Sequence, residues 1–189
     1  MPEEAQLQET EGGFEPAGEG WFVVNVGDTK WMTHHVFGSG CTFESREDAP
    51  FKDLGININT LAPGQPLCLY HRENAQEDFL VLAGEGVLLV EGEERPLKAW
   101  DFVHCPPNTE HVIVGAGDGP CIVLAVGSRP ANLDDEEILY PKSELAAKYG
   151  ASAKEETPSP QEAYAPFAPR PEPKRPNYWA DLPWSGTQT

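Results

Sequence analysis

Positive charge is scarce in this chain, and long apolar runs are missing. Lys and Arg number 13 against 31 Asp and Glu, which gives a formal net charge of −18 over 189 residues. Nucleic-acid binding depends on clustered Lys and Arg, so this balance argues against a nucleic-acid partner. It also disfavours anionic membrane surfaces. No apolar run approaches the ~20 residues of a membrane-spanning helix, so we expect no membrane partner.

Cysteines are also few, and their spacing does not suggest a disulfide framework. None belongs to a Cys-x-x-Cys pair, and each lies beside apolar or turn residues: Cys41, Cys68, Cys105 and Cys121. Buried free thiols are therefore a better interpretation than a cysteine zinc site. The first residues show neither the basic region nor the apolar stretch of a signal peptide. We therefore expect a soluble protein in a reducing, cytoplasmic setting.

Composition divides the chain into one domain with flanking segments. Residues 1–20 are rich in Glu, Gly and Ala, and we interpret them as an acidic, flexible N-terminal arm. Residues 21–130 contain short strand-like runs that turn residues separate at intervals of roughly 8 to 12, which is typical of an all-β sandwich or barrel. Residues 131–150 form a short helical segment, with the helix expected over 143–149 and Gly150 placed to end it.

Proline dominates residues 151–189 and favours an extended tail over a packed element. The tail is unusually aromatic for a solvated linker, with Tyr164, Phe167, Tyr178, Trp179 and Trp184. These side chains would bury apolar area by docking along the barrel or on a neighbouring subunit. Alternatively, the tail would act as a peptide that docks another protein.

Three strand predictions precede the main motif. Residues 21–26 are the first plausible strand, and residues 31–37 are the second. The second contains His34 and His35, of which at most one can face a common site because neighbouring strand residues point to opposite faces. A surface or packed position is the simpler interpretation for both histidines. Residues 54–61 alternate apolar and polar side chains, which indicates a half-buried strand.

Residues that can bind metals gather around the next strands. His71, Glu73 and Glu77 occupy positions i, i+2 and i+6 directly before an apolar run. Residues i and i+2 of a strand share a face, so His71 and Glu73 would point into one cavity, and Glu77 would join them after a turn or bulge. His111 follows a second strand-like run and the turn at 106–108. Two imidazoles and one or two carboxylates that converge would hold a divalent metal ion.

With this pattern the chain resembles the cupin superfamily, in particular its small single-domain members, over roughly residues 54 to 127. The first cupin motif contains Gly, His-x-His, Glu and Gly at set intervals, and its places are occupied by Gly64, His71, Glu73, Glu77 and Gly84. The second motif contains Gly, Asp, Pro-x-Gly, His and Asn, and its places are occupied by Trp100, Asp101, Pro106, Asn108, His111 and Gly115.

The resemblance implies a cupin-type double-stranded β-helix, or jelly-roll barrel, with a short C-terminal helix and an extended tail added to it. It implies a metal site made of His71, Glu73, Glu77 and His111. It also implies a homodimer, since the N-terminal strands of small cupins often complete a partner's sheet.

Four positions depart from the family pattern. Glu73 replaces the second His of the first motif, so the usual set of three His and one Glu becomes two and two. Asn108 replaces a turn Gly, which is a mild change because Asn tolerates left-handed backbone angles. Trp100 also replaces a turn Gly, and Gly115 replaces the closing Asn.

Two functions remain open from the sequence. The first is a metal-dependent enzyme for a small organic molecule, with dioxygenase-like or isomerase-like chemistry and Fe, Mn, Zn or Ni as the ion. Glu73 would then be either a metal ligand or the catalytic general base. The second is a non-catalytic module that binds or senses a small-molecule ligand. His104 is expected to pack behind the site, and Tyr70 to point toward an interface or the core.

Overall fold

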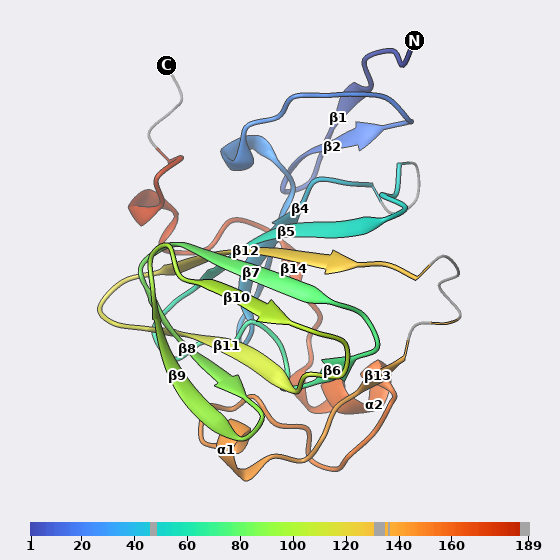
Figure 1. The fold of residues 1–189 in the computed structure, drawn as a ribbon. Helices are drawn as coiled ribbons and strands as arrows, with labels where there is room; N and C mark the ends of the chain where they lie inside the picture. Colours follow the sequence, from blue (N-terminus) through green and yellow to red (C-terminus); the bar gives the residue numbers. More distant parts are fainter. Residues whose placement is uncertain (46–48, 131–134, 136, 186–189) are drawn as a thin grey trace.

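The computed structural model describes residues 1–45, 49–130, 135 and 137–185 (Figure 1). It is mostly β, and the expected all-β fold is confirmed. The strands are β1 (Gln6–Thr10), β2 (Gly13–Ala17), β3 (Trp31–His34), β4 (Gly38–Thr42), β5 (Leu54–Leu61), β6 (Arg72–Glu73), β7 (Glu77–Ala83), β8 (Glu85–Val90), β9 (Glu93–Lys98), β10 (Phe102–Cys105), β11 (His111–Ala116), β12 (Cys121–Ser128), β13 (Ile138–Leu139) and β14 (Glu172–Pro173). The helical elements are η1 (Val26–Asp28), α1 (Glu144–Ala147), α2 (Pro160–Tyr164), η3 (Ala165–Phe167) and η4 (Trp179–Asp181).

Two antiparallel sheets form the barrel. The larger has the strand order β10-β7-β12-β5-β4-β3-β14, and the smaller has the order β11-β8-β9. The large sheet crosses the middle of Figure 1, and β8, β9 and β11 lie below it. The short pair β13-β6 stands beside them. Most neighbours in the large sheet are distant in sequence, as in a jelly roll.

The barrel interior is apolar because alternate residues of each strand point inward. On β7, Phe79 and Val81 are buried in the interior cluster. The same cluster contains Leu88 of β8, Ile113 of β11 and Val123 of β12. These five side chains come from both sheets, and burying their apolar surface is what holds the two layers together.

The N-terminal arm differs from its prediction. Residues 1–20 contain a hairpin, in which β1 pairs with β2 through the register Leu7↔Pro16. The hairpin is joined to the next segment by a hydrogen bond from the Lys30 amide to the Phe14 carbonyl and by the ion pair between Lys30 and Glu15 at 3.1 Å. Backbone pairing needs few large apolar side chains, which is why composition alone pointed to an arm without strands.

The expected strand over residues 21–26 is also absent. Only Trp21 makes an isolated bridge, with Glu4, and the chain then turns through η1. Asn25 caps this turn, since its side chain accepts a hydrogen bond from the Gly27 amide at 2.8 Å. A short local bond of this kind competes with strand pairing and explains the difference.

The tail is packed against the large sheet instead of being simply extended. In Figure 1 it runs from α2, at the lower right of the view, to the red coil of η4 at the upper left. Strand β14 pairs with β3, and the Tyr178 hydroxyl donates to the Thr60 carbonyl at 2.8 Å. The indole of Trp31, which is fully buried, contacts those of Trp179 and Trp184 at 5.3 and 5.6 Å between ring centroids. Of the alternatives for the aromatic residues, the structure shows docking along the barrel.

Helix α1 lies within the predicted range, and the Ser143 side chain caps it by accepting from the Ala146 amide. Residues 131–134 and 136 of the predicted helical segment lie outside the described residues.

All four cysteines are free thiols, as predicted, and Cys68 is the one that is only half-buried. Within the part of the chain that the structure describes, no helix has the length and apolar character needed to cross a bilayer.

Candidate metal centre

A cross-strand pair of histidines forms the base of the site. His71 and His111 lie directly opposite one another in an antiparallel bridge. The His71 amide donates to the His111 carbonyl at 3.2 Å, and the His111 amide donates to the His71 carbonyl at 2.8 Å. Opposed residues project to the same face, so the two imidazoles are neighbours, with ring centroids 5.1 Å apart. Backbone pairing alone therefore brings together residues 40 positions apart in the sequence.

Both imidazoles are oriented in the same way by the carbonyl two residues earlier. His71 Nδ1 lies 2.8 Å from the Leu69 carbonyl oxygen, and His111 Nδ1 lies 2.9 Å from that of Thr109. A carbonyl oxygen only accepts, so each Nδ1 carries the proton and donates it. In the neutral ring, Nε2 then keeps its lone pair, which is the arrangement that a metal-binding histidine requires.

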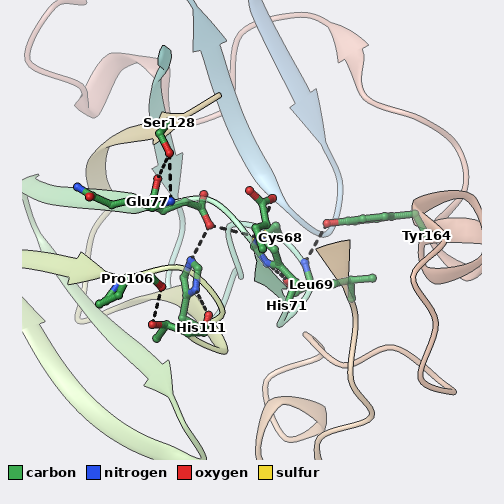
Figure 2. A network of polar contacts seen from close by, with 11 residues as sticks. Cys68, Leu69, His71, Glu77, Pro106, His111, Ser128 and Tyr164 are labelled. Carbon is green, nitrogen blue, oxygen red and sulfur yellow. Dashed lines mark hydrogen bonds and ion pairs between the residues drawn. The ribbon is translucent and has the colours of Figure 1, made fainter. Parts of the chain in front are cut away.

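Glu77, at the start of β7, completes the group. Its Oε2 lies 3.2 Å from His111 Nε2 and 3.6 Å from His71 Nε2. Figure 2 shows Glu77 and His111 pointing toward one another, with His71 beside them. Strand β7 pairs with both β10 and β12 at this residue, through Cys105 and Gly127, so the Glu77 backbone is fixed on both sides.

The three residues fit a metal ion. One ligand atom from each of His71, Glu77 and His111 lies within 4.8 Å of the others. Glu77 Oε2 and His111 Nε2 are buried, and apart from the ion pairs within this group no hydrogen bond satisfies them. Buried polar atoms without a partner are costly, and a cation placed between them would satisfy both. Two imidazoles and one carboxylate are a common donor set for divalent transition metals.

The charges of the metal-free site are strongly coupled. Burial disfavours the charged forms of all three groups, but their mutual contacts outweigh it. The pKa of His111 rises to about 10, against the effect of burial, through hydrogen bonds with Cys105 and Glu77. The pKa of His71 is raised well above its ordinary value, also against burial, by Cys68, Glu73 and Glu77. The pKa of Glu77 falls to about 2 because both imidazoles stabilise its carboxylate despite its burial. Protons therefore occupy the positions that a metal would take.

Glu73 stands at the edge of this group. Its Oε1 lies 3.4 Å from His71 Nε2, and no contact joins it to His111. It belongs to β6, whose short pairing with β13 opposes Glu73 to Ile138. The structure therefore brings together three of the four predicted ligands and leaves Glu73 within reach of one imidazole.

A cavity of about 370 Å³ opens in front of the site. It is lined by the four predicted residues and by the polar side chains of Asn57 and Asn59. The strand over residues 54–61 was predicted correctly, but its interpretation as half-buried was wrong. Asn57 and Asn59 line the cavity, while Ile58 packs on the outer face beneath the tail. Both faces of this strand are covered. The aromatic residues of the tail were the one signal in the sequence for a second apolar face, because such side chains need an apolar surface to pack against.

The other histidines take no part in the site. His104 is exposed rather than packed behind the ligands, and its Nδ1 contacts Asp78 at 2.6 Å. His34 is packed, with Nε2 donating to the Phe167 carbonyl at 2.8 Å, and His35 is exposed. Tyr70 points into the core, where its hydroxyl accepts from the Gly92 amide at 3.2 Å.

Three of the four residues that depart from the family pattern can be interpreted from the backbone geometry around them. Trp100 and Asn108 have positive φ angles of 75° and 69°, so both adopt the backbone that a turn glycine would take. For Trp100 this conformation is strained, and its indole is exposed. Gly115 has no room for a side chain, since a Cβ there would lie 2.4 Å from the Ala62 carbonyl oxygen.

Comparison with known proteins agrees with this architecture. Residues 57–127 match the family model described as a cupin domain. An uncharacterized protein of Methanocaldococcus jannaschii is 29% identical over 76 residues, which are 40% of this chain and 61% of that protein. Auxin-binding protein 1 of Arabidopsis thaliana is 34% identical over 88 residues, which are 42% of this chain and 44% of that protein. The matched stretches span less than two thirds of either relative.

Among solved structures, a sugar phosphate isomerase of the cupin superfamily from Silicibacter pomeroyi has the same fold. It superimposes with a TM-score of 0.53 at 21% identity, covering 66% of this chain and 88% of that one. At this identity the similarity establishes the fold and nothing finer.

Proposed function

Because residues 57–127 match the cupin family model, we propose that this protein binds one divalent metal ion and acts there on a small organic molecule. The ligands are His71, Glu77 and His111, and the ion is one of Fe, Mn, Zn or Ni. The reaction is dioxygenase-like or isomerase-like. The observation that carries the proposal is the convergence of three potential ligands in a buried site, where Glu77 Oε2 and His111 Nε2 face one another at 3.2 Å and have no hydrogen bond outside the group.

Each residue of the site has a defined task in this proposal. The Leu69 and Thr109 carbonyls hold the imidazoles with Nε2 toward the cavity. A bound divalent ion would supply Lewis-acid polarisation of a substrate oxygen. Glu73, which is half-buried at the cavity wall, is placed either to add a fourth ligand or to take a proton from bound substrate. Asn57 and Asn59 offer amide groups to orient polar parts of the substrate.

Metal analysis of the purified protein tests the proposal. We expect about one ion per chain in the wild type and a loss of at least tenfold in metal affinity for His111→Ala or Glu77→Gln. His104→Ala and Glu85→Gln are matched controls, since both alter exposed residues, and they should bind metal like the wild type. Equal metal binding by His111→Ala and His104→Ala would contradict the proposed site.

Glu73→Gln separates the two roles of Glu73. If Glu73 is a ligand, the substitution weakens metal binding. If it is the general base, the ion is retained and turnover is lost.

A non-catalytic ligand-binding module is the second candidate, and one finding favours it. Auxin-binding protein 1, which shares 34% identity over 88 residues, is named for binding rather than for a reaction. The two candidates differ in whether the protein converts the bound compound into a product. Incubation of the metal-loaded protein with a bound compound, followed by mass spectrometry, would return the compound unchanged if the protein is a binding module.

A further inference from the structure

A second cavity, of about 600 Å³, lies beside the metal centre, and the tail forms one of its walls. The barrel wall comes from β3, β4 and neighbouring loops, and the tail wall comes from residues 160–171. The two cavities adjoin, because they share the lining residues Asn59, Leu67, Cys68 and Tyr164. The tail lies outside residues 57–127, so this cavity is an addition to the cupin domain. Cavities of roughly 300–1,000 Å³ are typical of small-molecule sites.

Aromatic rings line the cavity on both sides. Phe37 lies beside β4, and the rings of Tyr164 and Phe167 in the tail contact it edge to face, at 5.2 and 5.0 Å between centroids. All three rings are half-buried, so each keeps part of its surface toward the cavity. Such rings favour a planar aromatic guest, which can stack on one ring and meet the edge of another.

Hydrogen bonds hold this wall in place. The Tyr164 hydroxyl accepts from the Leu69 amide at 3.1 Å, as Figure 2 shows. The imidazole of His34 donates to the Phe167 carbonyl at 2.8 Å. Leu69 also orients His71 through its carbonyl. The tail wall and the metal centre are therefore attached to the same short segment of backbone.

An exposed cationic side chain is among the residues that line the cavity. Arg170 is exposed and lines both this cavity and the next one along the tail. Among residues 1–45, 49–130, 135 and 137–185, no hydrogen bond or ion pair engages its guanidinium. In a chain with 31 acidic side chains, an arginine without a carboxylate partner is available to an anionic ligand.

We propose that the small molecule of this site is a planar aromatic carboxylate. Its ring would pack against the sides of Phe37 and Phe167 that face the cavity, its carboxylate would pair with Arg170, and its other end would reach the metal centre past Cys68. The link to the metal rests on the proposed function, whereas the ring and carboxylate contacts rest on the tail cavity alone.

Titration calorimetry with two probes tests the inference on the full-length, metal-loaded protein. We expect 2-naphthoate to bind and 2-naphthamide, which lacks the charge, to bind about tenfold more weakly. Arg170→Gln should abolish this preference, while Arg95→Gln, an exposed arginine paired with Glu93, should keep it. Phe167→Ala should weaken both probes about tenfold, and Phe102→Ala, an exposed Phe on β10, should change neither.

Equal affinity for the two probes in the wild type, or the same preference in Arg170→Gln, would overturn the inference. Arg170 is exposed, so its substitution leaves the fold intact and keeps the test decisive. The variant His111→Ala separates this inference from the proposed function. If it binds no metal and still prefers 2-naphthoate through Arg170, the aromatic site stands without help from the metal. If the wild type binds metal and neither probe, only the inference fails.

Discussion

At the scale of single residues, protonation of His71, Glu77 and His111 determines what the site can bind. In the metal-free protein, contacts with Cys105 and Glu77 raise the pKa of His111 to about 10 against burial and the repulsion of His71, and both imidazoles lower that of Glu77 to about 2 against its burial. A metal ion needs the lone pair of Nε2, so binding must displace the protons held there. The folded site is thus prepared for positive charge, which either protons or a metal ion supply.

The pH dependence of metal binding follows from these shifts. Near neutral pH, which is below the raised pKa of His111, the imidazoles hold protons that the metal must release, so metal affinity should rise with pH. We expect an increase of about tenfold per pH unit for each proton displaced, between pH 6 and 8. Calorimetry in buffers of different ionisation enthalpy measures the number of protons released. An affinity that does not change over this range would contradict the assigned protonation states.

At the scale of elements, the tail decides which face of the large sheet is covered. Its last part packs Leu182, which is 2% exposed, against the outer face of the sheet around Trp31. Its middle part forms the wall of the aromatic cavity. Because the tail covers the apolar side of β5, the asparagines on the other side of that strand can face the metal cavity.

Replacement of Leu182 measures how much this docking contributes. We expect Leu182→Ala to lower the free energy of unfolding by about 2–5 kcal/mol, the usual cost of truncating a buried leucine. Leu54→Ala removes the same atoms from a residue that is 43% exposed and should change stability by no more than about 0.5 kcal/mol. Urea unfolding followed by tryptophan fluorescence reports on both variants. Identical midpoints for the two would show that the tail adds nothing to stability.

At the scale of the whole molecule, the candidate metal centre joins parts of the barrel that are far apart in the chain. His71 precedes β6, Glu77 begins β7 and His111 begins β11 of the smaller sheet. A metal bound by all three would connect both sheets and would bind the folded chain only, because the unfolded chain does not hold the ligands together. The homodimer that the resemblance implies stays a prediction, which sedimentation analysis would test.

Metal should therefore stabilise the whole fold. At a free metal concentration 100 times the dissociation constant, the free energy of unfolding should increase by about 2.7 kcal/mol. Thermal unfolding of the wild type before and after treatment with a chelator measures this difference. Glu77→Gln, which removes the shared carboxylate and weakens metal binding, should show a clearly smaller difference between its unfolding temperatures with and without the chelator. A wild-type protein that is insensitive to chelation would show that no metal binds the native state.

The sequence by itself determined the fold class and proposed four residues for the site. Alternating strands with regular turns indicate a β barrel, and the spacing of His71, Glu73, Glu77 and His111 favours a metal-binding motif, because both signals are patterns along the chain. The hairpin of residues 6–17 escaped prediction, since its pairing uses backbone groups that every sequence has.

Only the tertiary structure decided how these parts meet. Glu73 and His111 were both predicted as ligands, yet the fold places only His111 opposite His71, because backbone pairing between strands is set by the whole barrel. The sequence also left the position of the tail open, because that position depends on the folded barrel. Proline content indicates where regular pairing is difficult, whereas the surface that an aromatic side chain covers depends on which apolar face the folded sheet leaves open.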